Sequence, residues 1–461
     1  MPPCWSDSFS RCLPSSFASV PTSPENFSPR HARAREGVVS WVLVLLPLAM
    51  LALGFPFFLI LLTTAVVVLA FFSNLPSVAI HQVMFSSLDK YALLAVPFFL
   101  FAGDLMGRGG VSERLVNWVT SMIGRVRGSL PFTALGTAAV FSAISGSTAA
   151  TTAAVGSLTY QRLRNEGYNE RFSSSLLISV GAIDNLIPPS IGFILYGIAS
   201  ETSIVRLFAA GVFPGLVLTA FFALYIYLYC VNRGETRGQP FTLARFIAAT
   251  RDGIWSILAP VVILGGIYSG VFSPTEAAGV ACVYAIIITA FVYREVTLRE
   301  VFRIAARSMY LTAQIFTIVA VAGVFAWILT VNGVPQAMVA SIAELAMPPW
   351  AVLLAINLLL LAVGMFLDTA SSILVLSPLL VPIAKAIGVD PVHFGVILVM
   401  NLSIGTFTPP FGINIFIGQA VFKAQLSAIY PGLMPFIAIA VAALMVVTYI
   451  PSLSLWMLRF V

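Results

Sequence analysis

The chain has 461 residues, of which 59% are hydrophobic and only 9% charged, and its formal net charge is +6. Soluble proteins average about 25% charged residues, so this composition excludes a soluble globular domain. Apolar runs near or above the roughly 20 residues that cross a bilayer recur along the chain and predict an all-α polytopic membrane protein. These runs cover 38–73, 91–107, 208–231, 254–293, 309–331, 349–366, 394–422 and 430–458.

The first 37 residues differ from the rest of the chain. They are rich in Ser and Pro, carry four arginines and have no apolar core that could form a signal peptide. This composition predicts a disordered polar tail over 1–37. The four cysteines of the chain show no spacing typical of a metal site, and they imply no disulfide framework.

Two similar series of landmarks lie one behind the other in the chain. "GYNERF" (167–172) precedes an apolar run and then "LIPPSIGFILYG" (186–197), while "GVDPVHF" (388–394) precedes an apolar run and then "TFTPPFGINIFIG" (406–418). Upstream, the small and hydroxyl-rich stretches 142–158 and 362–378 correspond at nearly the same offset. Such paired interruptions of apolar segments predict two inverted-topology repeats, the pattern typical of secondary transporters.

The predicted organisation has two repeats and a linker. Each repeat contains two spans, a third span, a short surface helix, a re-entrant helical hairpin, a broken helix and a final span. Proline cannot continue a helix without losing a hydrogen bond, so each Pro-Pro pair predicts the break. The predicted segments are the first repeat 38–231 (hairpin 128–168, broken helix 172–200), the cytoplasmic linker 232–253 and the second repeat 254–461 (hairpin 349–386, broken helix 392–422).

The distribution of basic residues predicts the orientation. If the chain starts outside, the loops 108–127, 161–171, 231–252, 294–308 and 423–429 are cytoplasmic and contain 16 Lys or Arg residues. The loops on the opposite side contain only Lys90, Arg206, Lys385 and Arg459. Cytoplasmic loops of membrane proteins carry such an excess. In this orientation the arginines of the 1–37 tail lie outside, against the rule. The orientation also requires that 38–73 form two spans, with a break at Gly54 and Pro56.

The hairpin tips and helix breaks are the places where chemistry is expected. Backbone groups freed at a break cannot be satisfied by hydrocarbon, so they must face protein, water or an ion. Carbonyl, hydroxyl and amide oxygens suit Na⁺, and half-helix N-termini suit an anionic substrate. The predicted Na⁺ ligands are Ser145, Gly146, Ser147, Asp184, Asn185, Pro188, Asp368, Thr369, Gly405, Thr406, Thr408 and Pro409, and the predicted substrate contacts are Thr148, Ser371 and Asn414.

Structural roles compete with this interpretation. For a single Ser or Thr in a membrane helix, a hydrogen bond to its own backbone is as expected as a role in a binding site. Asp184 and Asp368 are stronger candidates, because intramembrane acids are costly and mark functional sites by default. Glu276 and Asp104 lie nearer span ends, where a helix-start or interfacial role is at least as expected. Whether Thr406, Thr408 and Asn414 contact ion, substrate or only backbone stays open.

Other function classes are less well supported. An intramembrane aspartyl protease would use two aspartates, but neither "GAIDN" nor "GMFLD" resembles the motifs of that class. A channel explains paired breaks less well than alternating access does, and a primary pump would need an ATP-binding loop, which this sequence lacks. An anion symporter that works without a binding protein is the remaining alternative.

The stretch "GMFLDTASSILVLSPLLVPIAKAIGVDPVHFGVILVMNLSIGTFTPPFGINIFI" (364–417) closely resembles the large membrane subunit of tripartite ATP-independent periplasmic (TRAP) transporters. Similar stretches are "LLAVPFFLFAGDLM" (93–106), "FSAISGSTAATTAAVGSL" (141–158) and "GVFSPTEAAGVACVYA" (270–285), and the likeness runs from about residue 38 to the end.

The resemblance implies a function. It implies a bacterial inner-membrane, Na⁺-driven importer of an organic acid such as a dicarboxylate or sialic acid, with no enzymatic activity and no organic cofactor. It also implies a small four-helix membrane subunit and a periplasmic binding protein as partners, and elevator-type movement. The family's Na⁺-site features match at Ser145 to Ser147 with Pro188, and at Asp368 and Thr369 with 406–410. Asp184 and Asn185 depart from the small or apolar residues that the family commonly has before "LIPPS".

Overall fold

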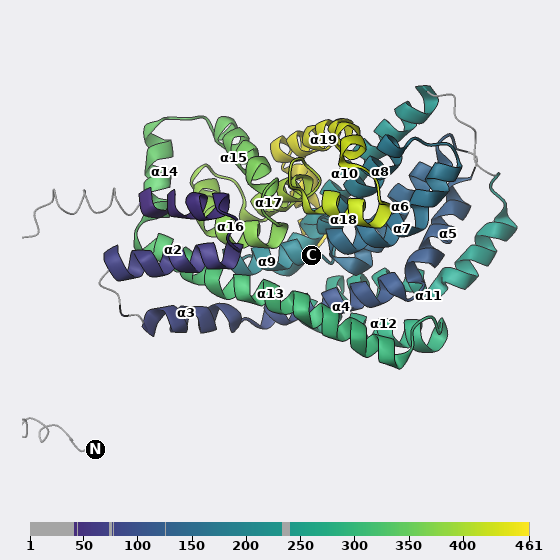
Figure 1. Ribbon diagram of the computed structural model, residues 1–461, viewed down its shortest axis with the longest axis horizontal. Helices are drawn as coiled ribbons and strands as arrows, with labels where there is room; N and C mark the ends of the chain where they lie inside the picture. The colour runs from purple at the N-terminus through teal and green to yellow at the C-terminus, as the bar shows by residue number, and fades with distance from the viewer. Residues whose placement is uncertain are drawn as a thin grey trace, which may run out of the picture.

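The computed structural model describes residues 41–43, 45–72, 76, 78–124, 126–232 and 240–460. The predicted tail 1–37 lies outside the described residues. Within them, seven helices are long and apolar enough to cross a membrane. The remaining helices are shorter, and together with the long ones they form the bundle in Figure 1, which agrees with the predicted all-α class.

The helices before the first hairpin are divided by turns. Gly54 has φ +79°, and α2 (Phe57–Phe72) begins three residues after it, so the break predicted near Gly54 and Pro56 is present. The sequence did not indicate α3 (Val78–Leu88), which lies between α2 and the next span. That span consists of η1 (Tyr91–Leu94) and α4 (Ala95–Arg108), and α5 (Val111–Ile123) follows it.

Two helix pairs and two interrupted helices occupy the regions that the sequence singled out. In the first half, α6 and α7 form a pair with its tip at 146–147, and the next segment passes from α8 through the 3₁₀ turn η2 to α9. In the second half, α15 and α16 have their tip at 365–368, and α17 and α18 are separated by 406–412. The bounds are α6 Ser129–Ser145, α7 Thr148–Asn165, α8 Glu170–Val180, η2 Gly181–Asn185, α9 Ile191–Ser200, α15 Pro349–Gly364, α16 Thr369–Ala386, α17 Pro391–Gly405 and α18 Ile413–Phe422.

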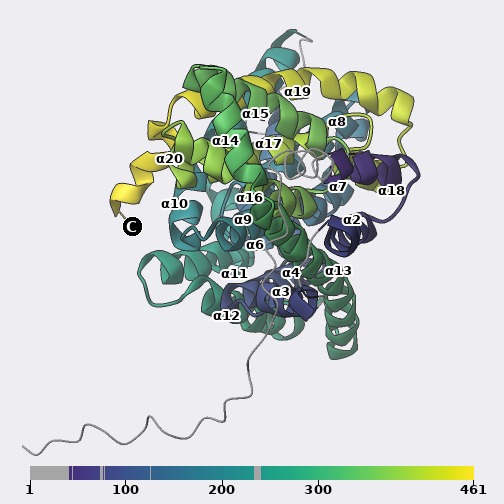
Figure 2. The same cartoon turned by 90° about the vertical axis from the view of Figure 1, so that its left-hand side faces the viewer.

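Each hairpin packs against the interrupted helix of the other half as well as its own. Helix α16 contacts α9, and α18 contacts α7, while α15 contacts α17 and α7 contacts α8. Figures 1 and 2 both show α16 beside α9. The two halves therefore meet at the hairpin tips.

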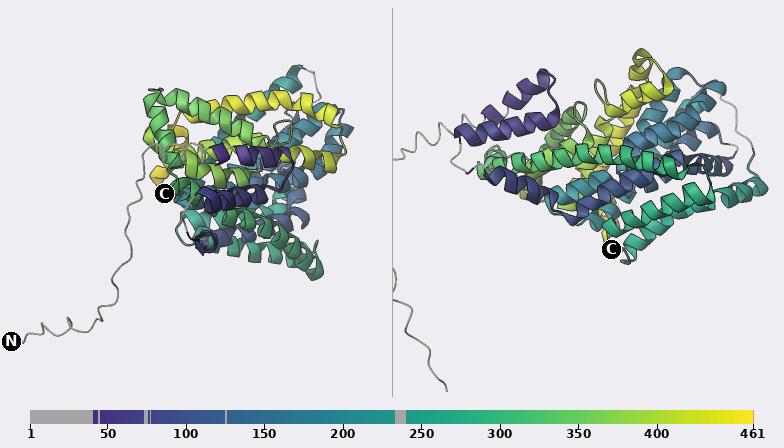
Figure 3. Two further views of the ribbon diagram at one scale, coloured as in Figure 1. Left: turned by 60° about the vertical axis from the view of Figure 1, so that its left-hand side comes forward. Right: turned by 60° about the horizontal axis from the view of Figure 1, so that its bottom comes forward.

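Two helices extend beyond the apolar runs that predicted them. Helix α11 (Leu243–Tyr268) begins 11 residues before the apolar run 254–293, inside the segment 232–253 that the sequence assigned to a cytoplasmic linker. Helix α13 (Leu298–Val331) begins 11 residues before 309, and its 34 residues span about 51 Å. Charged residues end an apolar run without ending a helix, because their side chains point outward from its first turns. Figures 1 and 3 show α13 along most of the molecule.

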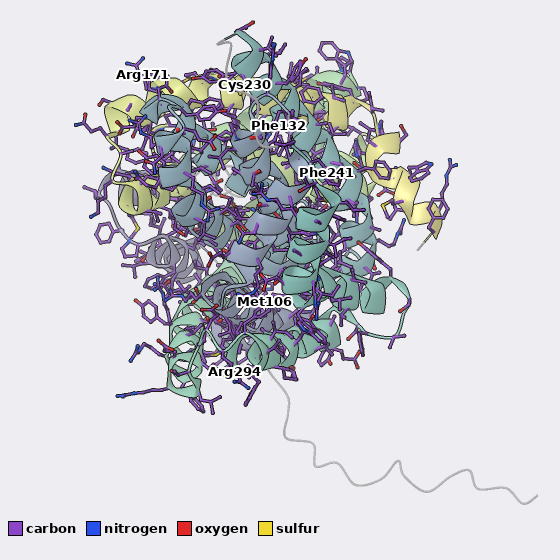
Figure 4. The ribbon with its side chains drawn as sticks, turned by 90° about the vertical axis from the view of Figure 1, so that its right-hand side faces the viewer. Met106, Phe132, Arg171, Cys230, Phe241 and Arg294 are labelled. Carbon is purple, nitrogen blue, oxygen red and sulfur yellow. The ribbon has the colours of Figure 1, made fainter. Side chains whose placement is uncertain are left out.

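The remaining helices complete the bundle and bring the basic loops to one end. Arg171 and Arg294, from two loops predicted to be cytoplasmic, both lie at the end that faces the viewer in Figure 4. Glu276 forms a capping box with Ser273 at the start of α12, which confirms its helix-start role. The bounds are α10 Ile204–Asn232, α12 Pro274–Ile286, η3 Ile287–Val292, α14 Val334–Glu344, α19 Leu426–Tyr449, α20 Ser452–Leu455 and η4 Trp456–Phe460.

Candidate functional site

A cavity of about 670 Å³, called here the site cavity, lies where the two halves meet. The first residues of four helices line it: Thr148 of α7, Ile191 of α9, Thr369 of α16 and Ile413 of α18. Side chains of α13 close another side, including Gln314. The N-termini of two hairpin helices and of two interrupted helices therefore converge on one space.

The electrostatic character of the site cavity follows from this convergence. Each helix N-terminus carries a partial positive charge, which favours an anion. Asp368 is the only Asp, Glu, Lys, Arg or His residue among those that line the cavity. An anion bound there would meet several helix ends and one carboxylate. The carboxylate favours the simultaneous presence of a cation.

The first hairpin tip touches the break of its own half. Gly146 has φ +64°, and a Cβ atom there would lie 2.8 Å from the carbonyl oxygen of Pro189. The carbonyl of Gly146 accepts a 3.4 Å hydrogen bond from the N–H of Ile191. Ser147 caps α7 by accepting from the N–H of Ala150 at 3.5 Å. Glycine is therefore required at 146 by both the backbone conformation and the close approach.

Asp184 lies in η2, behind the first hairpin. Its side chain is completely buried, and Thr151 Oγ1 donates to its Oδ1 at 2.5 Å. The other oxygen, Oδ2, is buried and has no hydrogen-bond partner. Asn185, the next residue, is 5% exposed and lines the site cavity. Asp184 therefore lies in an enclosed region, whereas Asn185 lines the site cavity.

Asp368 occupies a different position in the second half. It caps α16: Oδ2 accepts from the N–H of Ser371 at 3.0 Å, and Oδ1 accepts from its hydroxyl at 2.5 Å. The side chain is half-buried and lines the site cavity. At the neighbouring helix ends, a Cβ atom on Gly405 would lie 2.5 Å from the carbonyl carbon of Gly364. Close backbone contact therefore holds the second hairpin against the second break.

The hydroxyls of the second break bond mainly to their own chain. Thr406 Oγ1 donates to the carbonyl of Ser403 at 2.6 Å, and Thr408 Oγ1 donates to that of Ile404 at 2.7 Å. Asn414 Nδ2 donates to Thr406 Oγ1 at 3.1 Å, which leaves Asn414 Oδ1 buried without a partner. In this conformation the two threonines stabilise the end of α17. Asn414 retains one free oxygen for a ligand.

The structure separates the predicted site residues into two groups. One group lines the site cavity and contains residues from both hairpin tips and the first break. The other group lies outside the cavity lining, at the end of α6 and around the two breaks. The cavity group is Gly146, Ser147, Thr148, Asn185, Asp368, Thr369 and Ser371, and the other group is Ser145, Asp184, Pro188, Gly405, Thr406, Thr408, Pro409 and Asn414. Both breaks contain a cis proline, at Pro189 and at Pro410.

Two residues that belong to the site, Gln314 and Thr151, were not predicted from the sequence. Gln314 of α13 lines the site cavity, and a lone glutamine within the apolar run 309–331 could have indicated it. Thr151 bonds to Asp184, and its place in the "TAATTAAV" stretch gave a weaker signal, because threonines are frequent there.

The donor set of the two breaks fits a hard cation. Hydroxyl, carbonyl, amide and carboxylate oxygens surround them, and Asp184 Oδ2 and Asn414 Oδ1 are buried there without partners. Among the described residues, no group of three or more His, Cys, Asp or Glu side chains could hold a metal ion. Oxygen donors of this kind suit a hard cation, and Na⁺ is the one that the sequence predicts.

Comparison with known proteins identifies the family. The model of the tripartite ATP-independent periplasmic transporter DctM component matches residues 43–453. The chain belongs to this family. The large permease subunits of TRAP transporters are transporters of the inner membrane, so this chain is a multi-pass inner-membrane permease subunit and not an enzyme.

Individual relatives support the same assignment. A C4-dicarboxylate TRAP transporter large permease of Pseudomonas aeruginosa is 40% identical over 81% of this chain and 87% of that protein. An ectoine TRAP transporter large permease of Halomonas elongata is 37% identical over 90% of this chain and 98% of that protein. The solved YdaH transporter of Alcanivorax borkumensis, at 13% identity, covers 92% of this chain and 98% of its own with a TM-score of 0.64. It supports the fold alone.

Proposed function

We propose that this TRAP permease subunit imports an organic acid and is driven by Na⁺. The substrate carboxylate binds in the site cavity against the N-termini of α7, α9, α16 and α18. Na⁺ ions bind beside it, between each hairpin tip and its neighbouring break. The observation that carries the proposal is the convergence of the four helix N-termini on one cavity whose lining includes Asp368 and no basic side chain.

Charge balance links the ion to the substrate. An anion in the site cavity is stabilised by the helix ends but repelled by the carboxylate of Asp368. A cation held near Asp368 and Thr369 reverses that repulsion, because its charge acts over a few ångströms in a medium of low dielectric constant. Na⁺ binding therefore favours substrate binding. The reverse also holds, since the coupling between two ligands is reciprocal.

The first half would supply a second ion position from Ser145, Gly146, Ser147, Asn185 and the Pro188 break, with Asp184 behind it. The tip carbonyl of Gly146 already contacts Ile191. Asp184 Oδ2, which is buried without a hydrogen-bond partner, would offer a carboxyl oxygen to a cation in the same region.

The substrate class is a small carboxylate. The relatives above are named for C4-dicarboxylates and for ectoine, so closely related chains serve different compounds. A cavity of about 670 Å³ has room for such molecules and for a larger acid such as a sialic acid. Its polar contacts are mostly backbone N–H groups and hydroxyls. These would recognise a carboxylate group, and a periplasmic binding protein would select the molecule.

The chain would act with a small four-helix membrane subunit and a periplasmic binding protein. Its membership of a tripartite family supports these partners. An elevator movement would carry the hairpins and interrupted helices, including α9 and α16, along α13.

The test is uptake of the labelled organic acid by proteoliposomes that contain this chain, its small partner and the binding protein. We expect uptake to require an inward Na⁺ gradient and to stop when the binding protein is omitted. Uptake that ignores the Na⁺ gradient would refute the coupling. Uptake without a binding protein would instead indicate a symporter of a different kind.

A further inference from the structure

A second cavity, of about 380 Å³, lies along the same three helices as the site cavity. We call it the outer cavity. On all three helices, the residues that line the outer cavity lie nearer the C-terminus than those that line the site cavity. The lining residues of the site cavity and of the outer cavity are, in turn, 191–195 and 198–201 at α9, 311–318 and 319–326 on α13, and 368–371 and 374–382 at α16. At 1.5 Å per residue, each shift is about 10–13 Å. The two cavities therefore follow one another along a single seam.

The seam leads toward the side that the charge distribution assigns to the periplasm. Lys90, one of the four basic residues outside the tail on that side, lines the outer cavity. Ala322, Gly323 and Ala326 form the α13 wall, and their small side chains leave room there. A Cβ atom on Gly323 would lie 1.9 Å from Ser87 Oγ, so the glycine lets the end of α3 approach α13. The outer cavity is thus located on the route that a periplasmic substrate would follow.

The outer cavity contains polar groups without partners. Lys90 takes part in none of the ion pairs among the described residues. Ser377 of α16 also lines the cavity, is completely buried, and its Oγ has no hydrogen-bond partner. A buried hydroxyl without a hydrogen-bond partner is costly, so Ser377 Oγ is a group that a bound carboxylate would stabilise by accepting its hydrogen bond. An ammonium group and a free hydroxyl together match a carboxylate, which accepts hydrogen bonds from both.

Glu201 also lines the outer cavity, and its charge is opposite to that of Lys90. It follows the last turn of α9, is exposed and forms no ion pair with Lys90 among the described residues. Its carboxylate repels an anion at the cavity, so it weakens binding there. A transit site benefits from weak binding, because a tightly held substrate would not proceed to the site cavity.

We propose that the outer cavity is a binding subsite for the carboxylate group of the incoming substrate, with Lys90 as its counter-ion and Ser377 as its hydrogen-bond donor. The inference rests on the proposed function, because it assumes an organic acid that enters from the periplasm. It adds a binding step before the site cavity, on the same seam.

The experiment measures how fast acetic anhydride acetylates individual lysines of the full chain in lipid nanodiscs, by mass spectrometry. Millimolar succinate is the probe, and neutral succinamide of similar size is its control. We expect succinate to slow acetylation of Lys90 about three- to fivefold, the range of a partly exposed ion pair. Lys385 is on the same predicted side and does not line the outer cavity, so its rate should change little. Equal rates at Lys90 with succinate and with succinamide would overturn the proposal.

Variants sharpen the result. Ser377→Ala should reduce the protection of Lys90 about twofold. Glu201→Gln should increase it, and a decrease would show that the cavity binds a cationic group instead. In the uptake assay, Lys90→Gln should raise the half-saturating substrate concentration severalfold more than Lys385→Gln. If wild-type uptake ignores Na⁺, the coupling proposed above fails; if uptake is Na⁺-driven and both lysine variants behave alike, only the outer subsite fails.

Discussion

The two halves of the molecule place their carboxylates on opposite sides of the same kind of junction. In the first half, Asp184 belongs to the interrupted helix, is completely buried and is not among the residues that line the site cavity. In the second half, Asp368 belongs to the hairpin tip, caps α16 and lines the cavity. The two junctions between hairpin and break therefore differ in where they place their carboxyl group, although their helices are arranged alike. In the proposed mechanism, Asp368 acts directly on a substrate in the cavity, whereas Asp184 acts only through buried groups.

This difference assigns different tasks to the two ions of the proposed mechanism. A cation beside Asp368 neutralises the charge that opposes a carboxylate in the cavity. A cation beside Asp184 neutralises a buried charge and so stabilises the contact between the first hairpin and its break, since an uncompensated buried carboxylate is strongly unfavourable. The following variants test this division.

The largest effect is expected for Asp368→Asn. Asparagine caps a helix as well as aspartate does, so α16 should remain intact while the negative charge is lost. We expect Na⁺-driven uptake to fall about 100-fold, as for the loss of a charged ligand worth up to about 3 kcal/mol. Asp390→Asn is the matched control, because Asp390 caps α17 in the same way and lies outside the cavity lining. Equal loss in both variants would contradict a special role for the negative charge of Asp368 at the site cavity.

A smaller effect is expected for Asp184→Asn. The amide can still accept a hydrogen bond from Thr151, but it no longer carries a charge for a cation. The Na⁺ concentration that half-stabilises the purified chain against heat should rise about tenfold. Asp104→Asn is the control, since Asp104 also has a buried oxygen without a partner but pairs with Arg108 at 3.0 Å. An unchanged Na⁺ response in Asp184→Asn would remove Asp184 from the ion site.

Gly405→Ala tests how closely the second hairpin must approach its break. A methyl group would overlap the backbone of Gly364, and such overpacking costs about 1 kcal/mol or more. We expect a lower midpoint of thermal unfolding. Gly279→Ala, where nothing lies within 4 Å, should be neutral or slightly stabilising. If both variants unfold at the same temperature, the contact between Gly405 and Gly364 does not hold the hairpin.

The smallest effect is expected for Thr408→Val. The Thr408 hydroxyl donates a hydrogen bond to the carbonyl of Ile404, and the end of the helix tolerates the loss of that bond. Na⁺-driven uptake should change less than about twofold. A loss approaching that of Asp368→Asn would mean that Thr408 turns toward the ion in another conformation.

The sequence predicted much of this arrangement. The apolar runs predicted the all-α membrane class, and the helix interruptions before α9 and before α18 contain the two proline pairs, because proline disfavours a continuous helix. The start of α11 was missed, since charged residues ended the apolar run but not the helix. The division between Asp184 and Asn185 could not be predicted, because neighbouring residues in a 3₁₀ turn point in different directions, and only the packing of α7 shows which one is enclosed.

The most direct test of the account is a Na⁺ titration of thermal stability on the purified wild-type chain, with millimolar succinate and with succinamide. If the ion and the carboxylate meet in the site cavity, succinate should lower the half-saturating Na⁺ concentration about fivefold or more, within the usual range of coupling between sites. Asp368→Asn should abolish that shift. A half-saturating Na⁺ concentration that is the same with succinate and with succinamide would contradict the coupling of Na⁺ to the substrate at this cavity.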